Sequence, residues 1–174
     1  PINTAFDNRA KRLLILQPST NTLLAVAEGS DGKLDASTLV RYDARYFGVH
    51  NPGGMAVDPN DGRLYILDRT TYDLVSVEPA ANGSFDGAAG SEESLRALAM
   101  VDPRGLAFDP TTGHLHILSA GTQKLFEITP AGQVKAIRDL SQFGLSNPQG
   151  MAFAPSGDLT DDPAEMSLYI AESG

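Results

Sequence analysis

One pattern occurs four times along the chain, and its spacing constrains the fold more than any other sequence feature. An aspartate after "AF" or "AV" recurs as Asp7, Asp58 and Asp109, at a spacing of 51 residues, and Ala154 replaces it in a fourth copy. Each copy also has a proline six residues before this position, a glycine or asparagine four before and an alanine two before. These positions are Pro1, Pro52, Pro103 and Pro148; Asn3, Gly54, Gly105 and Gly150; and Ala5, Ala56, Ala107 and Ala152. Such regular spacing indicates a tandem repeat architecture.

Each copy predicts a small antiparallel sheet. Short runs rich in β-branched and aromatic residues, separated by Pro- and Gly-containing turns, predict strands at 54–58, 63–68 and 73–78 of the second copy. A more variable fourth strand is expected within 33–42, 84–98 and 133–140 of successive copies, although 91–100 also fits a short helical turn. Tandem sheets of about 40–50 residues are typical of β-propeller blades.

The predicted fold class is therefore all-β, a β-propeller segment of about 3.5 four-stranded blades. The blades are expected at about 1–46, 47–97, 98–144 and 145–174, the last one incomplete. A closed ring needs roughly 4–8 blades, so we expect a single segment of a six- to eight-bladed ring. The remaining blades would come from the same polypeptide, of which this chain would be a piece, or from another chain.

The repeated positions themselves predict structural roles. Glycine alternating with asparagine indicates a backbone site of positive φ, and the constant alanine indicates close packing. The anchor aspartates are expected to cap the turns that follow them. A base stands five residues after each anchor, so each turn is expected to pair an acid with a base; these bases are Arg12, Arg63 and His114.

Composition excludes several classes of partner. The chain has 13 Lys and Arg against 22 Asp and Glu, a net charge of −9, which argues against nucleic acid as a partner. No apolar run approaches the roughly 18 residues that a membrane span needs. There is no cysteine, which excludes disulfides and thiol chemistry.

Two stretches resemble NHL-type β-propeller repeats: "NPQGMAFAPSG" followed by "SLYIAESG", and "DPRGLAFDPTTGHLHIL". They are also similar to the related gluconolactonase/regucalcin and paraoxonase-like six-bladed propellers. This resemblance implies the blade architecture but not one function, because the family includes protein-binding, RNA-binding, lyase and secreted scaffold modules. The hydrolases of the group hold a metal in a central tunnel, and Asn51 and Asn147, which precede repeat prolines, are placed to face such a tunnel.

Only the fourth copy carries an acidic insert, at 158–166. Clustered carboxylates on a loop suit Ca²⁺, which is the one cofactor that the sequence suggests. The alternative is a solvated acidic loop, because the spacing does not match an EF-hand. The candidate metal ligands are Asp158, Asp161, Asp162 and Glu165.

The three histidines and two edge segments give further candidates. His114 and His116 share a strand face and are spaced to bind a metal, but their repeat positions favour structural roles. His50 lies in the loop before the first strand of the second blade and, with Asn51 and Asn147, is a candidate for a binding face. Residues 41–47 and 95–100 are candidate partner-binding edges, with packing as the alternative.

No motif of a known catalytic centre occurs, so no catalytic or cofactor-binding residue is assigned. The sequence favours a non-catalytic, extracellular or cell-surface binding module that presents loops to a protein or small-molecule ligand. One alternative is a metal-dependent hydrolase or lyase of the gluconolactonase or paraoxonase-like type. Another is a self-assembling protein that pairs through open blade edges.

Overall fold

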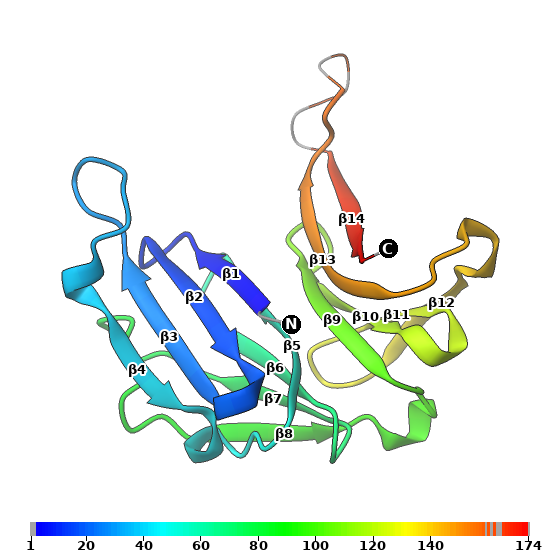
Figure 1. The fold of residues 1–174 in the computed structure, drawn as a ribbon, viewed down its shortest axis with the longest axis horizontal. Helices are drawn as coiled ribbons and strands as arrows, with labels where there is room; N and C mark the ends of the chain where they lie inside the picture. Colours follow the sequence, from blue (N-terminus) through cyan, green and yellow to red (C-terminus); the bar gives the residue numbers. More distant parts are fainter. Residues whose placement is uncertain (1–2, 159, 161, 163–164, 174) are drawn as a thin grey trace. The chain divides into compact units, whose positions relative to one another are not determined.

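The computed structural model describes residues 3–158, 160, 162 and 165–173, and within them the chain forms three four-stranded sheets and one two-stranded sheet. In each four-stranded sheet the strands are antiparallel and lie in chain order (Figure 1). The predicted all-β propeller class is confirmed. The chain divides into two compact units, 1–98 and 99–174. That the two units together form a single propeller segment stays a prediction.

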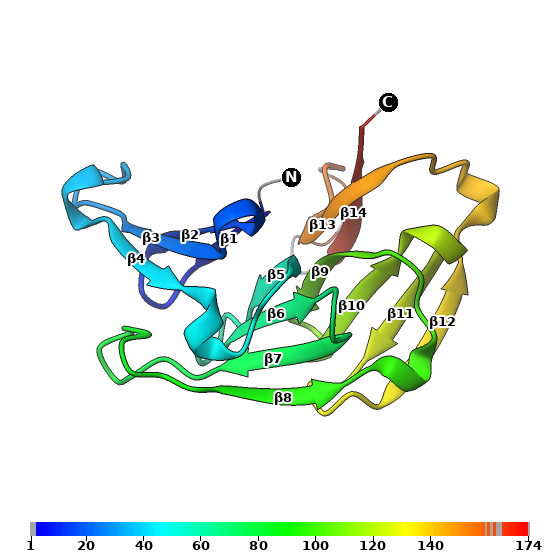
Figure 2. The same ribbon diagram turned by 60° about the horizontal axis from the view of Figure 1, so that its bottom comes forward.

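The first unit contains two sheets, drawn from two directions in Figures 1 and 2. The first sheet consists of β1 (Asn3–Asp7), β2 (Arg12–Gln17), β3 (Thr22–Ala27) and β4 (Val40–Asp43). The second consists of β5 (Pro52–Val57), β6 (Leu64–Asp68), β7 (Asp73–Val77) and β8 (Gly90–Ser94). Short 3₁₀ turns η1 (Pro18–Thr20), η2 (Ala36–Thr38), η3 (Ala44–Phe47) and η4 (Arg96–Leu98) join or follow these strands.

The second unit contains one complete sheet and one hairpin. The sheet consists of β9 (Pro103–Asp109), β10 (His114–Ser119), β11 (Lys124–Ile128) and β12 (Val134–Asp139), and the hairpin of β13 (Pro148–Pro155) and β14 (Met166–Glu172). The connections include η5 (Ala120–Thr122) and η6 (Ser141–Phe143). No helix in the described part of the chain is long and apolar enough to cross a membrane.

The cores lie where successive sheets pack within a unit. In the first unit, buried leucines of β2 pack with Ile66 of β6 and with Phe47 and Phe85, which come from loops. In the second unit, Leu118 and Leu125 pack with Leu140 against partly buried side chains of the β13–β14 hairpin. Strand β2 thus buries alternate residues, as the period of two predicts, whereas every residue of β6 is buried.

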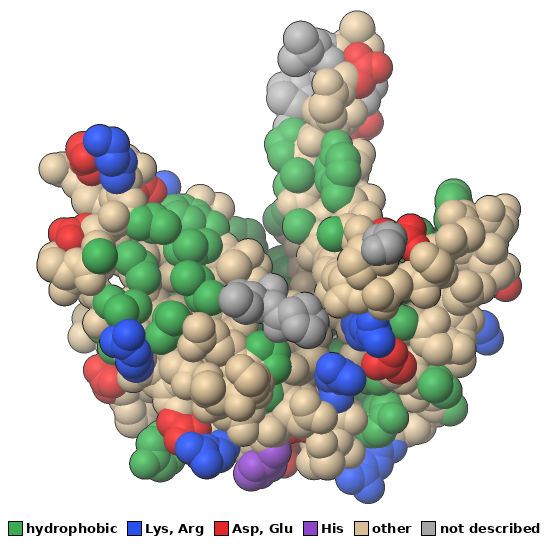
Figure 3. All heavy atoms as spheres, viewed as in Figure 1, with side chains coloured by type: hydrophobic (Ala, Val, Ile, Leu, Met, Phe, Trp, Pro, Cys, Tyr) green, Lys and Arg blue, Asp and Glu red, His purple; other side chains and the backbone are tan. Residues whose placement is uncertain are grey.

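One face of the first sheet is only half covered. Figure 3 shows hydrophobic side chains gathered over β2 and β3. Ile15 and Leu24, which are opposite each other on these strands, are partly buried, and Phe6 of β1 is 40% exposed. Apolar surface of this kind is normally buried against another element.

The repeated glycine position is a β-bulge, which corrects the prediction of a shared positive φ. Among the four equivalent residues Asn3, Gly54, Gly105 and Gly150, Gly105 alone has a positive φ, of 65°. The strand register shifts next to this position in β5, β9 and β13. A bulge bends the inner strand, and a residue without a side chain there admits the neighbouring strand. A Cβ on Gly105 would lie 3.4 Å from the Cα of Gly150 on β13.

Close packing at the constant alanine holds in the middle of the chain. Ala56 and Ala107 are 5% and 4% exposed. Ala5 is half-buried and Ala152, on the terminal hairpin, is exposed. The position is therefore tightly packed in the second and third copies but not in the first and fourth.

The anchor aspartates cap their turns as predicted. Asp7 Oδ1 accepts the backbone amides of Arg9 and Ala10, both at 3.1 Å. Asp58 Oδ1 accepts the amide of Asn60 at 2.8 Å. In the third blade, Asp109 accepts the amide of Thr111 and the hydroxyl of Thr112, both at 2.8 Å.

The predicted acid–base pair across each turn forms only in the first blade, where Arg12 Nε lies 3.0 Å from Asp7 Oδ2. Arg63 instead pairs with Asp61 at 3.5 Å and Glu78 at 3.3 Å. His114 Nδ1 lies 2.8 Å from Glu127, which also binds Arg138. The alternative acids come from the turn itself (Asp61), from the residue after β7 (Glu78) and from β11, where Glu127 is directly opposite His116.

Candidate binding site

The loops before β5, β9 and β13 are each held by the last residue of the second strand of the same blade, and we call this contact the strand-end clamp. In the second blade the clamp is Asp68, which is fully buried. Its Oδ2 accepts the amides of His50 at 2.6 Å and Asn51 at 3.0 Å. Its Oδ1 accepts the amides of Thr70 at 2.7 Å and Thr71 at 3.1 Å.

The pKa of Asp68 shows the strength of this clamp. Burial acts to raise the pKa, but the four backbone amides stabilise the carboxylate and hold its pKa below the usual value. A charged group that accepts four amides fixes the loop rigidly. The loop before β5 is therefore preorganised.

Equivalent clamps occur in the second unit. Ser119 Oγ, fully buried at the end of β10, accepts the amide of Val101 at 2.9 Å. Glu172 Oε1, near the end of β14, accepts the amides of Ser146 and Asn147. The sequence analysis missed this feature, although a polar residue ends the second strand of every copy.

The binding-face candidates are exposed but partly engaged. His50 is exposed, and its carbonyl accepts Asn21 Nδ2 at 2.9 Å. Asn51 Nδ2 donates to Thr70 Oγ1 at 3.2 Å. Asn147 belongs to the second unit, where its Oδ1 accepts Arg104 Nη1 at 2.7 Å. His50 and Asn51 are thus adjacent on one loop, and both asparagine amides are bonded to residues of their own unit.

The acidic insert is described only in part. Asp158 accepts the amide and hydroxyl of Thr160 at 2.9 and 2.7 Å, and these bonds lower its pKa. The amide of Glu165 donates to the carbonyl of Asp162 at 2.8 Å. Asp161 lies outside the described residues. Among the described residues, no group of three or more His, Asp or Glu side chains is placed to hold a metal, so the Ca²⁺ site stays a prediction.

His114 and His116 have separate structural surroundings. His114 pairs with Glu127, and that hydrogen bond is the main reason why the pKa of Glu127 is lowered. His116 is buried at 6% exposure, with its ring edge-on to Phe153 at 5.0 Å between centroids. Burial lowers the pKa of His116, so it is neutral at neutral pH.

A pocket of about 580 Å³ lies in the first unit, and we call it the aromatic pocket. It is built by β4, by η3 and by the loop between β7 and β8. Phe85 from that loop packs edge-on against Tyr42 and Phe47, with ring centroids 5.7 and 6.2 Å apart. Tyr46 stands at the pocket with 82% of its surface exposed. The segment 41–47, which the sequence singled out as a partner-binding edge, thus lines a pocket.

Charged groups flank the aromatic pocket. Asp43 caps η3 by accepting the amide of Arg45 at 3.0 Å, and the Arg45 guanidinium binds the same carboxylate at 2.7–3.1 Å. The Arg45 side chain holds the pKa of Asp43 below its usual value. Arg41 and Asp86 also line the pocket. Four of the ten lining residues are aromatic and three are charged, so the pocket offers both apolar and polar contacts to a ligand.

These features define a protein built of β-propeller blades. Antiparallel four-stranded sheets follow one another along the chain, their inner strands are bulged at small residues, and the loops before those strands are clamped. The chain belongs to the SdiA-regulated family, whose model matches residues 9–160. No curated protein sequence matches the chain. The expectation of a propeller family is confirmed.

Solved structures share the fold at low sequence identity. A chain of the nidogen/laminin complex aligns with a TM-score of 0.60 at 20% identity, covering 97% of this chain and 54% of that one. Virginiamycin B lyase from Staphylococcus aureus aligns with a TM-score of 0.54 at 15% identity, covering 92% and 45%. Hydrazine synthase of Kuenenia stuttgartiensis aligns with a TM-score of 0.55 at 14% identity, covering 99% and 46%.

The chain therefore spans about half the length of these structures. They include enzymes and a protein–protein complex, so the fold does not distinguish catalysis from binding.

Proposed function

We propose that the chain is part of a non-catalytic β-propeller binding module, extracellular or on the cell surface, that holds a protein or small-molecule ligand in the aromatic pocket. One observation carries the proposal: Tyr46 is 82% exposed beside a pocket where Tyr42, Phe47 and Phe85 are buried. An exposed aromatic side chain beside a fixed aromatic floor is typical of binding hot spots.

The pocket is also preorganised. The Asp43 cap fixes η3, and the amide of Phe85 donates to the Tyr42 hydroxyl at 3.5 Å, which joins the loop of the second sheet to the first. Rigid sites lose less entropy on binding, so a preformed pocket supports recognition of a ligand.

The surroundings of Asn51 and Asn147 support binding over catalysis. The resemblance to propeller hydrolases implies that these amides face a metal. In this protein Asn51 is bonded to Thr70 and Asn147 to Arg104. A structural role accounts for both amides without a reaction centre.

We infer that further blades, from the same polypeptide or another chain, cover the half-buried face of the first sheet. Ile15 and Leu24 form a cross-strand apolar pair on that face. In both units, apolar side chains of one sheet are buried against the next sheet, so we expect this pair to be buried against another sheet in the same way.

A fragment screen by two-dimensional ¹⁵N NMR on the full chain tests the proposed function. The probes are small aromatic and aliphatic fragments, added one at a time. We expect the best fragments to shift amides of residues 41–47 and 85–89 and to lose most of their affinity for Tyr46→Ser. The matched control is Tyr72→Ser, a tyrosine that does not line the pocket. Fragments that bind elsewhere, or that bind Tyr46→Ser unchanged, contradict the proposal.

A further inference from the structure

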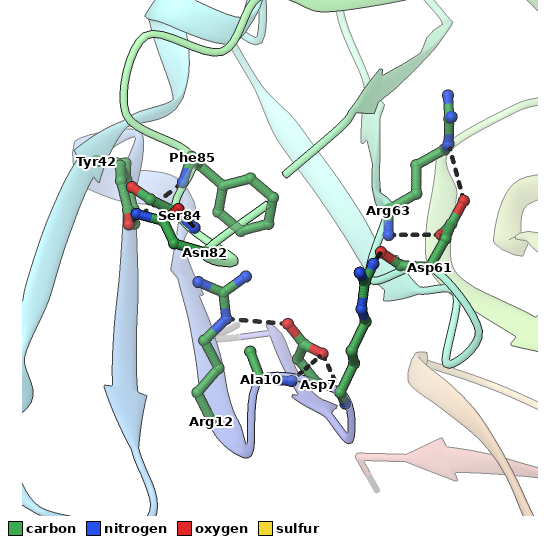
Figure 4. Close-up of polar contacts among 10 residues, drawn as sticks. Asp7, Ala10, Arg12, Tyr42, Asp61, Arg63, Asn82, Ser84 and Phe85 are labelled. Atoms are coloured by element: carbon green, nitrogen blue, oxygen red, sulfur yellow. Dashed lines mark hydrogen bonds and ion pairs between the residues drawn. The ribbon is translucent and has the colours of Figure 1, made fainter. Parts of the chain in front are cut away.

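Arg12 is a buried cation with an unused hydrogen-bond donor. Its side chain is 9% exposed, and its Nε donates to Asp7 Oδ2 at 3.0 Å. Its guanidinium carbon lies 4.6 Å from the centre of the Phe85 ring. Nη2 is buried and has no hydrogen-bond partner among the described residues. Figure 4 shows this guanidinium between Asp7 and the segment that carries Asn82, Ser84 and Phe85.

The cost of this arrangement points to a ligand. Leaving a buried donor unpaired is unfavourable, and more so when the donor is charged. Asp7 does not face this cost, because its carboxylate also accepts the amides of Arg9 and Ala10. An acceptor from outside the described residues would complete the hydrogen bonds of Arg12.

A pocket of about 250 Å³ lies against Arg12, distinct from the aromatic pocket although Tyr42 and Asp86 line both. Its polar lining includes Arg12, Asn82 and Ser84. Its apolar lining consists of Ala10, Ala25, Ala27 and Val40. A ligand here meets a donor at one point and short aliphatic side chains around it.

The charges in this pocket restrict the ligand further. Asp7 neutralises Arg12, so the carboxylate of Asp86 is the remaining charge in the lining. Ser84 Oγ donates to Asp86 Oδ2 at 2.8 Å and accepts the Asp86 amide at 3.0 Å, which fixes this carboxylate. A simple anion could accept a hydrogen bond from Arg12 but would be repelled by Asp86. A ligand with both an anionic acceptor and a cationic donor satisfies both groups.

We propose that this pocket binds a small zwitterion, an aliphatic α-amino acid, with its carboxylate on Arg12 and its ammonium group on Asp86. The alanine and valine side chains of the lining take the aliphatic part. The two pockets share Tyr42 and Asp86 but differ in Tyr46 and Arg12, so variants of these last two residues distinguish failure of one proposal from failure of the other.

Calorimetric titration of the full chain tests the proposal with three probes: L-alanine, propionate and ethylamine. Propionate and ethylamine each carry one of the two charges of L-alanine. We expect L-alanine to bind at least about tenfold more tightly than either, because it alone forms both charge-assisted contacts. Equal binding of propionate, or no binding of L-alanine, overturns the proposal.

Two variants locate the contacts. Arg12→Lys keeps a cation beside Asp7 but removes Nη2, and we expect at least about tenfold weaker L-alanine binding while the thermal melt shows a folded chain. Asp86→Asn changes an exposed side chain, and we expect weaker L-alanine binding with propionate binding unchanged or tighter. Asp31→Asn, an exposed acid outside the pocket, is the control and leaves binding unchanged. L-alanine binding that is unaffected in both Arg12→Lys and Asp86→Asn overturns the assignment.

Discussion

Replacing His116 by leucine is expected to stabilise the protein, and to do so more as the pH falls. His116 is 6% exposed, and neither ring nitrogen has a partner among the described residues. The equivalent residue of the first blade is Leu14, which is fully buried, so the repeat shows that leucine fits this position. The substitution removes a buried polar ring and keeps an apolar side chain.

The size of the effect follows from two opposing contributions. Removing an unpaired buried polar group gains about 1–3 kcal/mol. Losing the edge-on contact with Phe153, at 5.0 Å between centroids, costs about 0.5–1.5 kcal/mol. We therefore expect a net gain of roughly 1 kcal/mol in the free energy of unfolding at pH 7.5.

The pH dependence has a definite sign. Burial lowers the pKa of His116 in the folded protein below the usual value of 6.5, so below that pH the unfolded chain binds more protons at this residue than the folded chain does. Wild-type stability therefore falls as the pH drops below 6.5, by at most about 1.4 kcal/mol per pH unit from this residue. The leucine variant lacks this loss, so its advantage grows between pH 6.5 and 5.

Urea unfolding followed by far-ultraviolet circular dichroism at pH 7.5, 6.5 and 5.5 measures the difference. The two proteins differ only at residue 116, so the other histidines are common to both. The pKa values of Asp109 and Glu127 are lowered from 3.8 and 4.5, which places their effect below this window. His50→Leu, at an exposed loop position, is the control and should change stability by less than about 0.5 kcal/mol. A destabilised His116→Leu protein, or a gain independent of pH, would refute the reasoning.

Three further perturbations test other parts of the account. Asp68→Asn leaves amides of the clamped loop unpaired and should lower the free energy of unfolding in urea at pH 7 by about 2–3 kcal/mol, and an unchanged stability would contradict the clamp. Because the folded pKa of Asp68 is lowered below 3.8, the stabilisation by its carboxylate is full above that pH and is lost as the pH falls through the folded pKa. Phe85→Ala empties a fully buried site and should cost about 3–5 kcal/mol and abolish fragment binding, and a loss below 1 kcal/mol would show that the loop does not build the core. Ile15→Lys should reduce any self-association of the wild-type chain that light scattering detects, whereas Lys33→Glu, a change at an exposed residue, is the control and should not. Equal association of the two variants would contradict the inference that another blade covers this face of the first sheet.

The strands were predictable because each copy of the repeat shows the same local pattern of apolar residues and turn residues. The predicted strands 63–68 and 73–78 correspond to β6 (Leu64–Asp68) and β7 (Asp73–Val77). For the segment 91–100, the strand and the helical turn are both present: β8 ends at Ser94 and the 3₁₀ turn η4 follows. Alternation of apolar residues and turn signals depends only on neighbours along the chain, so one sequence suffices.

The errors arose where spatial neighbours decide. Arg63 and His114 were expected to pair with their own turn aspartates, but Glu78, directly after β7, and Glu127, on β11, offer partners. The glycine position was interpreted as a positive φ, whereas a bulge explains its small residue, and only Gly105 has that φ. Sequence spacing within one turn does not show which cross-strand neighbour competes for a side chain.

The candidate site was predictable only in part. Residues 41–47 were a candidate binding edge, with packing as the alternative, but the pocket also needs Phe85, which lies about 40 residues further along the chain in the loop between β7 and β8. The Arg12 guanidinium, whose Nη2 has no hydrogen-bond partner among the described residues, packs against Phe85 of that same loop. A contact between two blades has no local signal in a single sequence.

The most direct test of the central claim, binding without catalysis, is the rate of hydrolysis of δ-lactones and aryl esters by the full chain with added Ca²⁺ or Zn²⁺. The account predicts no rate above that of buffer with the same metal, in samples that bind fragments at residues 41–47 and 85–89. A metal-dependent rate that Asn51→Ala or Asn147→Ala abolishes while the fold is retained would contradict it.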